Sequence, residues 1–164
     1  MITDINSEDR LVQRTFAEHL GQRFGWDSAY AYNTEVLGPG GSLGRSTERD
    51  VVLLSDLRVA LARLNPNIPD DAREQAAQEL THIDLARSLL QHNRALYAFF
   101  RQGVPMAWKD ASGSAQHARA QVIDFRNVER NRFLAVRELK IQGVCPLCQH
   151  YVSRCTRARG LLAQ

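Results

Sequence analysis

The order in which two apolar patterns follow each other along the chain limits its fold class most. Apolar residues recur at helical spacing in several stretches between residues 11 and 101, and strand-like alternation takes over from Val104 to Ile141. Helices followed by strands are typical of folds in which helices cover one side of a sheet. The pattern therefore predicts an α/β fold with α+β-like order, in which helices pack on a mixed sheet.

The first two predicted helices are defined by their ends. Ser7 is a suitable N-cap for the first, and Gly25 provides its stop. Its expected apolar face consists of Leu11, Val12, Phe16, Leu20 and Phe24. The second helix is expected from Thr47 to Leu64, where Asn65-Pro66 ends it because the residue before proline is disfavoured in a helix. A turn of glycines, Gly38 to Gly44, lies between the two helices, and it lacks the Gly-Lys-Ser/Thr ending of a phosphate-binding loop.

Two more helices complete the first part of the chain. Pro69 followed by two acids predicts a third helix that continues to about Ile83. A fourth is expected from Leu85 to Arg101, closed by Gly103. Its inward-facing side chains are predicted to be Leu89, Leu90, Leu96, Phe99 and Phe100.

The last predicted elements form a meander of strands. Val104–Lys109, a turn at residues 110–114 and Ala118–Phe125 predict a hairpin. A polar turn then leads to a further strand, Phe133–Ile141. No apolar run approaches the roughly 20 residues that a membrane-spanning helix needs. The chain also shows no secretory signal, so we expect a cytoplasmic protein.

Three residues in these strands are arranged like a nuclease site. Asp124 is followed by Glu138 and, two positions later, by Lys140. Residues i and i+2 of a strand share one face, and two carboxylates beside a lysine could hold Mg²⁺ and activate a water. The alternative interpretation is an ordinary solvent-facing side of a half-buried strand, and it is the one that we favour from the residues alone.

Charge and cysteine content add a second set of candidates. The 164 residues have a net charge of +3, which permits nucleic-acid binding without requiring it. All three cysteines, Cys145, Cys148 and Cys155, lie near the C-terminus with His150 among them. The spacing of the first two suits a zinc knuckle. We expect no tight zinc site, because structural sites usually take two ligand pairs from more widely separated segments.

Ordered segments across most of the chain resemble one known family. They are SEDRLVQRTFAEHLGQRFGW, AYAYNTEVLGPGGSLGR, DLRVALARLNPNIPDDA, NRALYAFFRQGV and VIDFRNVERNRFLAVRELKIQG. Together, from about Ser7 to Gly143, they resemble the N-terminal domain of the restriction subunit of type I restriction–modification enzymes. The resemblance implies a partial PD-(D/E)xK nuclease-like domain over residues 1–143 and a divergent tail over residues 144–164.

The resemblance also implies a function and its partners. The family restricts DNA with Mg²⁺ and ATP, together with modification and specificity subunits. It places the core catalytic residues after Gly143, so Glu138 and Lys140 would lie on the strand before the catalytic hairpin, and no residue here matches the catalytic set. Glu8 alone could correspond to a helix-borne acid near the metal. We therefore expect a truncated subunit that has no cleavage activity or cofactor of its own.

Two other functions stay open at this point. One is a small basic DNA-binding or zinc-stabilised module. The other is a stand-alone Mg²⁺-dependent nuclease that uses Asp124, Glu138 and Lys140. Stoichiometric zinc would favour the first and Mg²⁺-dependent nicking of DNA the second.

Overall fold

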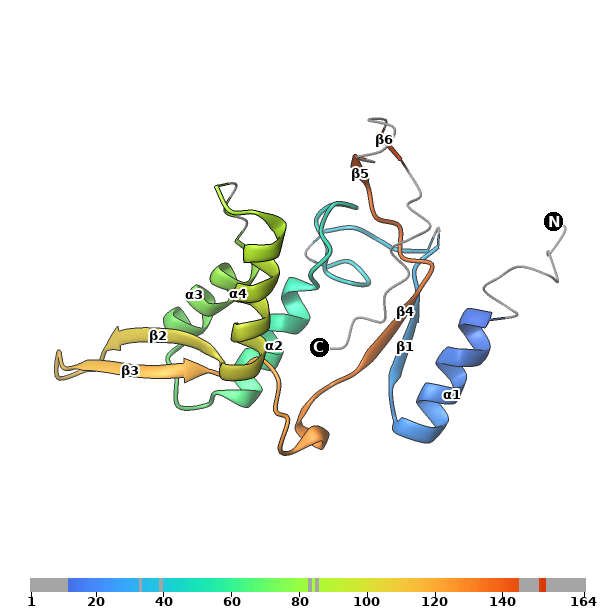
Figure 1. Cartoon of the computed structure of the whole chain (residues 1–164). Helices are drawn as coiled ribbons and strands as arrows, with labels where there is room; N and C mark the ends of the chain where they lie inside the picture. Colours follow the sequence, from blue (N-terminus) through green and yellow to red (C-terminus); the bar gives the residue numbers. More distant parts are fainter. Residues whose placement is uncertain are drawn as a thin grey trace, which may run out of the picture. The chain divides into compact units, whose positions relative to one another are not determined.

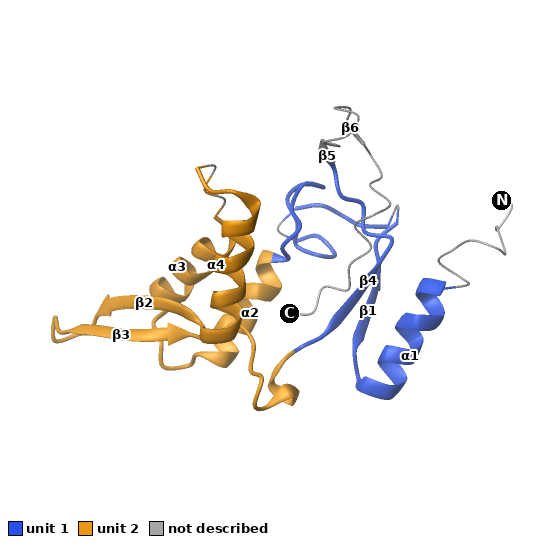
Figure 2. Cartoon of the chain, in the orientation of Figure 1, with its two compact units in different colours: residues 1–53, 132–163 blue, residues 54–131, 164 orange. Residues whose placement is uncertain are grey.

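The chain forms two compact units in a computed structural model (Figure 1). The structure describes residues 12–32, 34–38, 40–82, 84, 86–144 and 151–152. Unit 1 comprises residues 1–53 and 132–163, and unit 2 comprises residues 54–131 with residue 164 (Figure 2). Helices and strands occur in both, which confirms the mixed α/β class. The expected single mixed sheet was wrong, because the described strands form separate two-stranded pairs. The predicted division at residue 143 stays a prediction.

Unit 1 is built on a parallel pair of strands. β1 (Asp27–Tyr30) pairs with β4 (Leu134–Arg137) so that Asp27 lies opposite Leu134. α1 (Arg14–Phe24) covers one face, where Ala17 and Leu20 pack on Ala135. The other face carries a second cluster, which consists of Ala31, Leu43 and Leu53 with Ala29, Leu134, Val136 and Leu139. Strand β4 is therefore covered on both faces, whereas most of β1 stays exposed. A short antiparallel pair, β5 (Gly143–Val144) with β6 (Tyr151–Val152), completes this unit.

Unit 2 consists of three helices and a hairpin. α2 (Leu54–Leu64) packs against α3 (Asp70–Thr81), and α3 packs in turn on β2 (Val104–Lys109). β2 pairs antiparallel with β3 (Ala115–Ala120), and α4 (Leu89–Gln102) leads directly into β2 through Gly103. A 3₁₀ turn, η2 (Val128–Arg130), closes the unit. No helix among the described residues is long and apolar enough to cross a membrane.

Two of the predicted helix starts were wrong. The second helix begins at Leu54 rather than at Thr47, because the Asp50 carboxylate accepts the backbone N–H groups of Ser46 and Thr47 and closes a turn there. The fourth begins at Leu89, because Ser88 and Gln91 form a capping box at its start. In the first helix Gly25 ends α1 in the left-handed conformation, as predicted, while Ser7 lies outside the described residues.

The predicted apolar faces of two helices were also partly wrong. In α1, Leu20 is buried, but Phe16 and Phe24 are exposed, since α1 packs only on a narrow two-stranded pair. Val12, which precedes α1, is exposed as well. In α4 no residue is fully buried. Leu96 and Phe99 are half-buried, whereas the predicted inward residues Leu89, Leu90 and Phe100 are exposed. At 3.6 residues per turn Leu89 and Phe100 lie within about 40° of Leu96, so they stand at the exposed margin of the broad apolar arc whose half-buried part contains Phe99.

The first strand and the turn of the hairpin were predicted correctly, but the second strand was expected too late, at Ala118–Phe125, and the meander was wrong. β3 is Ala115–Ala120, whereas residues 121–127 form no strand. Asn65 explains part of this, because its side chain exchanges hydrogen bonds with the backbone N–H and C=O of Gln121 at 2.7 and 2.8 Å. The strand that follows, β4, pairs with β1 rather than with its neighbour in the sequence.

Candidate functional site

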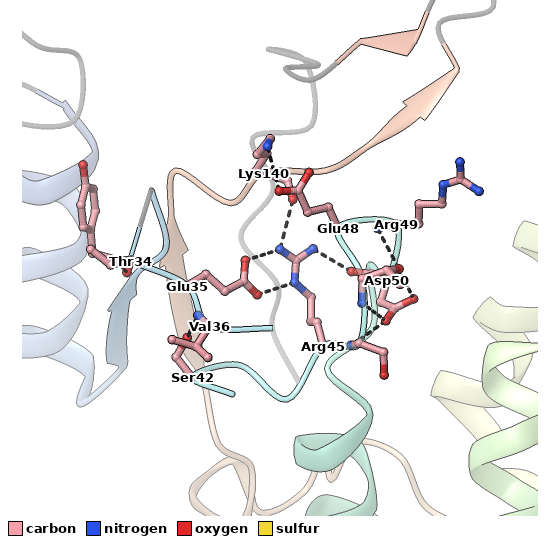
Figure 3. Close-up of polar contacts among 12 residues, drawn as sticks. Thr34, Glu35, Val36, Ser42, Arg45, Glu48, Arg49, Asp50 and Lys140 are labelled. Carbon is pink, nitrogen blue, oxygen red and sulfur yellow. Dashed lines mark hydrogen bonds and ion pairs between the residues drawn. The ribbon is translucent and has the colours of Figure 1, made fainter. Parts of the chain in front are cut away.

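The carboxyl edge of the β1–β4 pair is the candidate site that the structure offers. The strands are parallel, so the segments that leave Tyr30 and Arg137 emerge at the same edge. Open α/β folds commonly bind ligands at such an edge. Residues 31–35 follow β1 and residues 138–140 follow β4, and the loop of residues 42–50 joins them there (Figure 3).

A buried ion pair lies at the centre of this edge. The Arg45 side chain is fully buried and the Glu35 side chain nearly so. Arg45 Nε donates to Glu35 Oε1 at 2.7 Å, and Arg45 Nη2 donates to Glu35 Oε2. The guanidinium also donates to the backbone carbonyls of Asp50, at 2.9 Å, and of Lys140, at 3.1 Å. Arg45 therefore ties the segments after β1 and β4 to the loop.

A second, more exposed ion pair reinforces this connection. Lys140 Nζ lies 2.8 Å from Glu48 Oε1, and the Lys140 side chain is 46% exposed. The Gln142 N–H donates to the Glu48 carbonyl at 2.8 Å (Figure 3 shows the ion pair). Lys140, which the sequence suggested as a water-activating group, is thus engaged with a carboxylate.

Glu138 does not lie on a strand. Strand β4 ends at Arg137, and Glu138 follows with a φ of 54°, which is unusual for a residue other than glycine. Its side chain accepts a hydrogen bond from Gln13 Nε2 at 2.9 Å, and its N–H donates to Gln13 Oε1 at 3.2 Å. The expectation that Glu138 and Lys140 share a strand face was therefore wrong, because the backbone turns between them.

Asp124 belongs to unit 2 and closes a turn there. Its Oδ1 accepts the N–H groups of Arg126, at 3.0 Å, and Asn127, at 2.9 Å, and its Oδ2 pairs with Arg130 at 3.1 Å. The hydrogen bond from the Asn127 backbone is the main cause that lowers the pKa of Asp124, and the charge of Arg130 contributes. This carboxylate therefore serves the turn that precedes β4.

The glycine turn is closed by its own backbone. Gly38 N–H donates to the Arg45 carbonyl at 2.6 Å, and Gly41 N–H donates to the Gly38 carbonyl at 2.9 Å. Ser42 Oγ accepts the N–H of Val36 at 3.1 Å. The N–H groups of Gly38, Gly41, Ser42 and Gly44, which a phosphate-binding loop would present to a ligand, are therefore used within residues 36–45.

The ion pairs Glu35–Arg45 and Glu48–Lys140 hold the segments after β1 and β4 to the loop of residues 42–50, and we call this arrangement the clamp. Among the described residues no group of three or more His, Cys, Asp and Glu side chains could hold a metal ion. The residues that form the clamp, Glu35, Arg45 and Glu48, were not singled out by the sequence, since no local pattern marks a charged loop residue for burial. The candidates Glu8, Cys145, Cys148, His150 and Cys155 lie outside the described residues.

Comparison with known proteins gives the family. The sequence model described as "Type I restriction enzyme R protein N terminus" matches residues 5–152. The chain belongs to this family. The resemblance stated from the sequence is thereby confirmed, and with it the assignment to type I restriction enzymes.

One curated relative extends this result. The chain is 29% identical over 143 residues to the type I restriction enzyme HindI endonuclease subunit of Haemophilus influenzae. The match covers 87% of this chain and 13% of that subunit, so the chain corresponds to a small part of the relative's length. No solved structure matches the chain.

Proposed function

We propose that the chain acts in DNA restriction as the N-terminal part of a type I restriction enzyme endonuclease subunit. The observation that carries the proposal is the family match over residues 5–152. In this role the β1–β4 layer with α1 belongs to a PD-(D/E)xK-like nuclease fold. Its partners are DNA and the modification and specificity subunits, and it works in the cytoplasm.

We also propose that residues 12–144 do not themselves form a cleavage site. Glu138, Lys140 and Asp124 each have their own partner: Gln13, Glu48 and the turn of residues 126–130 respectively. Mg²⁺ prefers several oxygen ligands arranged around it, and each of these three side chains instead engages a different partner. Mg²⁺ and ATP therefore act with other parts of a complete subunit.

A chimeric subunit tests this function. Residues 12–144 replace the matching segment of the HindI endonuclease subunit, and DNA restriction is measured with that system's modification and specificity subunits. The expected result is ATP- and Mg²⁺-dependent cleavage above the level of a subunit that lacks the segment, because the chain supplies an equivalent domain. A chimera that assembles with its partners, yet cleaves no more than the deletion, would contradict the proposal.

A further inference from the structure

The solvent face of the β2–β3 hairpin has an unusual composition. The strand register places three pairs of residues on this face: Pro105 with Arg119, Ala107 with His117, and Lys109 with Ala115. All six side chains are exposed. The opposite face carries Val104, Met106 and Ala120, which are buried on the side of α3. Each basic or imidazole side chain of the solvent face is thus paired with a small residue.

The cations on this face are available to a partner. Lys109 has no ion-pair partner among the described residues, and Arg119 makes a single side-chain hydrogen bond, from Nη1 to the Gly103 carbonyl at 3.2 Å. The nearby acid Asp110 is engaged in the turn, where its carboxylate accepts hydrogen bonds from Ser112, Ser114 and Gln116. The face has no acid of its own.

The charge of unit 2 is divided along the sequence. Residues 54–84 contain three cations and six acids, residues 87–119 contain five cations and one acid, and residues 120–131 contain two of each. Solvated surfaces usually mix both signs. A face without acids, within the basic part of its unit, therefore favours a polyanionic partner.

We propose that the solvent face of the β2–β3 hairpin is a contact surface for the phosphate backbone of duplex DNA. A two-stranded ribbon fits the major groove, and its small residues allow close approach of the backbone. Lys109 and Arg119 lie four residues apart along the ribbon, roughly 14 Å at 3.4 Å per residue, so they reach different phosphates. A protein partner is less suitable, because this face has no large apolar side chain to anchor one.

The inference rests on the proposed function for its choice of DNA, and the salt dependence of binding tests it. The complete chain and its Lys109→Gln/Arg119→Gln variant are titrated against a labelled duplex at several NaCl concentrations. The slope of log K against log salt is negative, and each lost phosphate contact makes it shallower by about 0.9. The slope of the double variant should therefore be shallower than that of the wild type by about 2. The single variant Lys109→Gln, whose side chain has no described partner, should lose about 1 and guards against a folding defect in the double variant.

A matched variant removes equal charge elsewhere in unit 2. Arg63→Gln/Arg126→Gln takes away two exposed cations that lie outside the hairpin and should keep the wild-type slope. If the wild type binds tightly and the hairpin and control variants have equal slopes, the hairpin is not the DNA contact surface. That result would leave the proposed function intact. Absence of duplex binding by the wild-type chain at low salt would also contradict the proposed contact surface. The chimeric subunit tests the proposed function separately.

Discussion

Arg45 shows how one buried charge holds unit 1 together. Its guanidinium is fully buried and bound to Glu35 and to the carbonyls of Asp50 and Lys140. A buried pair adds little relative to apolar residues of similar size, but removal of one partner leaves the other charge buried and uncompensated. The same residue therefore determines how the segments after β1 and β4 are joined.

Loss of Arg45 should destabilise unit 1 strongly. Arg45→Ala is expected to lower the free energy of unfolding by about 3–5 kcal/mol, because it leaves the Glu35 carboxylate buried without its counter-ion. Urea titration followed by Trp26 fluorescence in a Trp108→Phe background reports on this unit alone. Glu18→Gln, which breaks the exposed Arg14–Glu18 pair, is the control and should change the free energy by less than about 1 kcal/mol. Similar losses for the two variants would contradict the account.

Asp124 should make unit 2 sensitive to acid. Its pKa is lowered in the folded chain, mainly by the hydrogen bond from the Asn127 backbone. A carboxyl group whose pKa is lowered on folding stabilises above its unfolded pKa of about 3.9, and this stabilisation is lost as the pH falls through the folded pKa. Unfolding followed by Trp108 fluorescence should therefore be easier at pH 3 than at pH 6 in a Trp26→Phe background. Asp124→Asn should weaken that difference, and an unchanged difference would contradict the role given to Asp124.

The glycine turn between β1 and α2 has positive φ at Gly38 and Gly44, and it leaves no room for a side chain at Gly41. A Cβ at Gly41 would lie 1.9 Å from the Val36 carbonyl oxygen, whereas a Cβ at Gly40 would meet no atom within 4 Å. The turn carries Arg45 and Glu48 to the edge of the strand pair. The clamp therefore requires that this turn stays compact, because the turn positions Arg45 and Glu48.

Gly41→Ala and Gly40→Ala form a matched pair that tests this turn. Gly41→Ala should destabilise unit 1 by more than about 1 kcal/mol, since backbone must move to accept the methyl group. Gly40→Ala should stay within about 0.5 kcal/mol of the wild type or stabilise it slightly. Both are measured by urea titration with Trp26 as the probe. A Gly41→Ala variant as stable as Gly40→Ala would mean that the turn is looser than described.

Local signals predicted some elements and could not predict others. Pro69 with the acids after it marked the start of α3, and the polar turn of residues 110–114 marked the hairpin. The pairing of β1 with β4 had no such signal, because the strands are about a hundred residues apart in the sequence. A strand covered on both faces also loses the alternation that reveals its register. The clamp was missed for the same reason, since Arg45 contacts Lys140 only through the fold.

For the whole molecule, the cysteine-rich tail is expected to bind no zinc tightly. Every candidate ligand lies between Cys145 and Cys155, and structural zinc sites usually combine two more widely separated pairs. Metal analysis of chain purified without chelators should find much less than one zinc per chain. One zinc per chain, lost together with stability in Cys148→Ser, would favour a zinc-stabilised module instead.

We infer that Asp124, Glu138 and Lys140 stabilise the fold of this domain and take no part in DNA cleavage. Catalysis by a metal needs its ligands and the activating lysine held together at one position. Each of the three residues instead engages a separate partner: the turn of residues 126–130, Gln13 and Glu48. Substitution of any of these three residues in a complete subunit should therefore leave DNA restriction intact, provided that the variant still folds.

The most direct measurement is nicking of supercoiled plasmid by the purified chain with Mg²⁺, compared among the wild type, Glu138→Ala and Lys140→Ala. We expect no Mg²⁺-dependent nicking by any of the three proteins, and equal results with EDTA. Clear Mg²⁺-dependent nicking by the wild type that both substitutions abolish would contradict this expectation, and would identify Glu138 and Lys140 as parts of an active site.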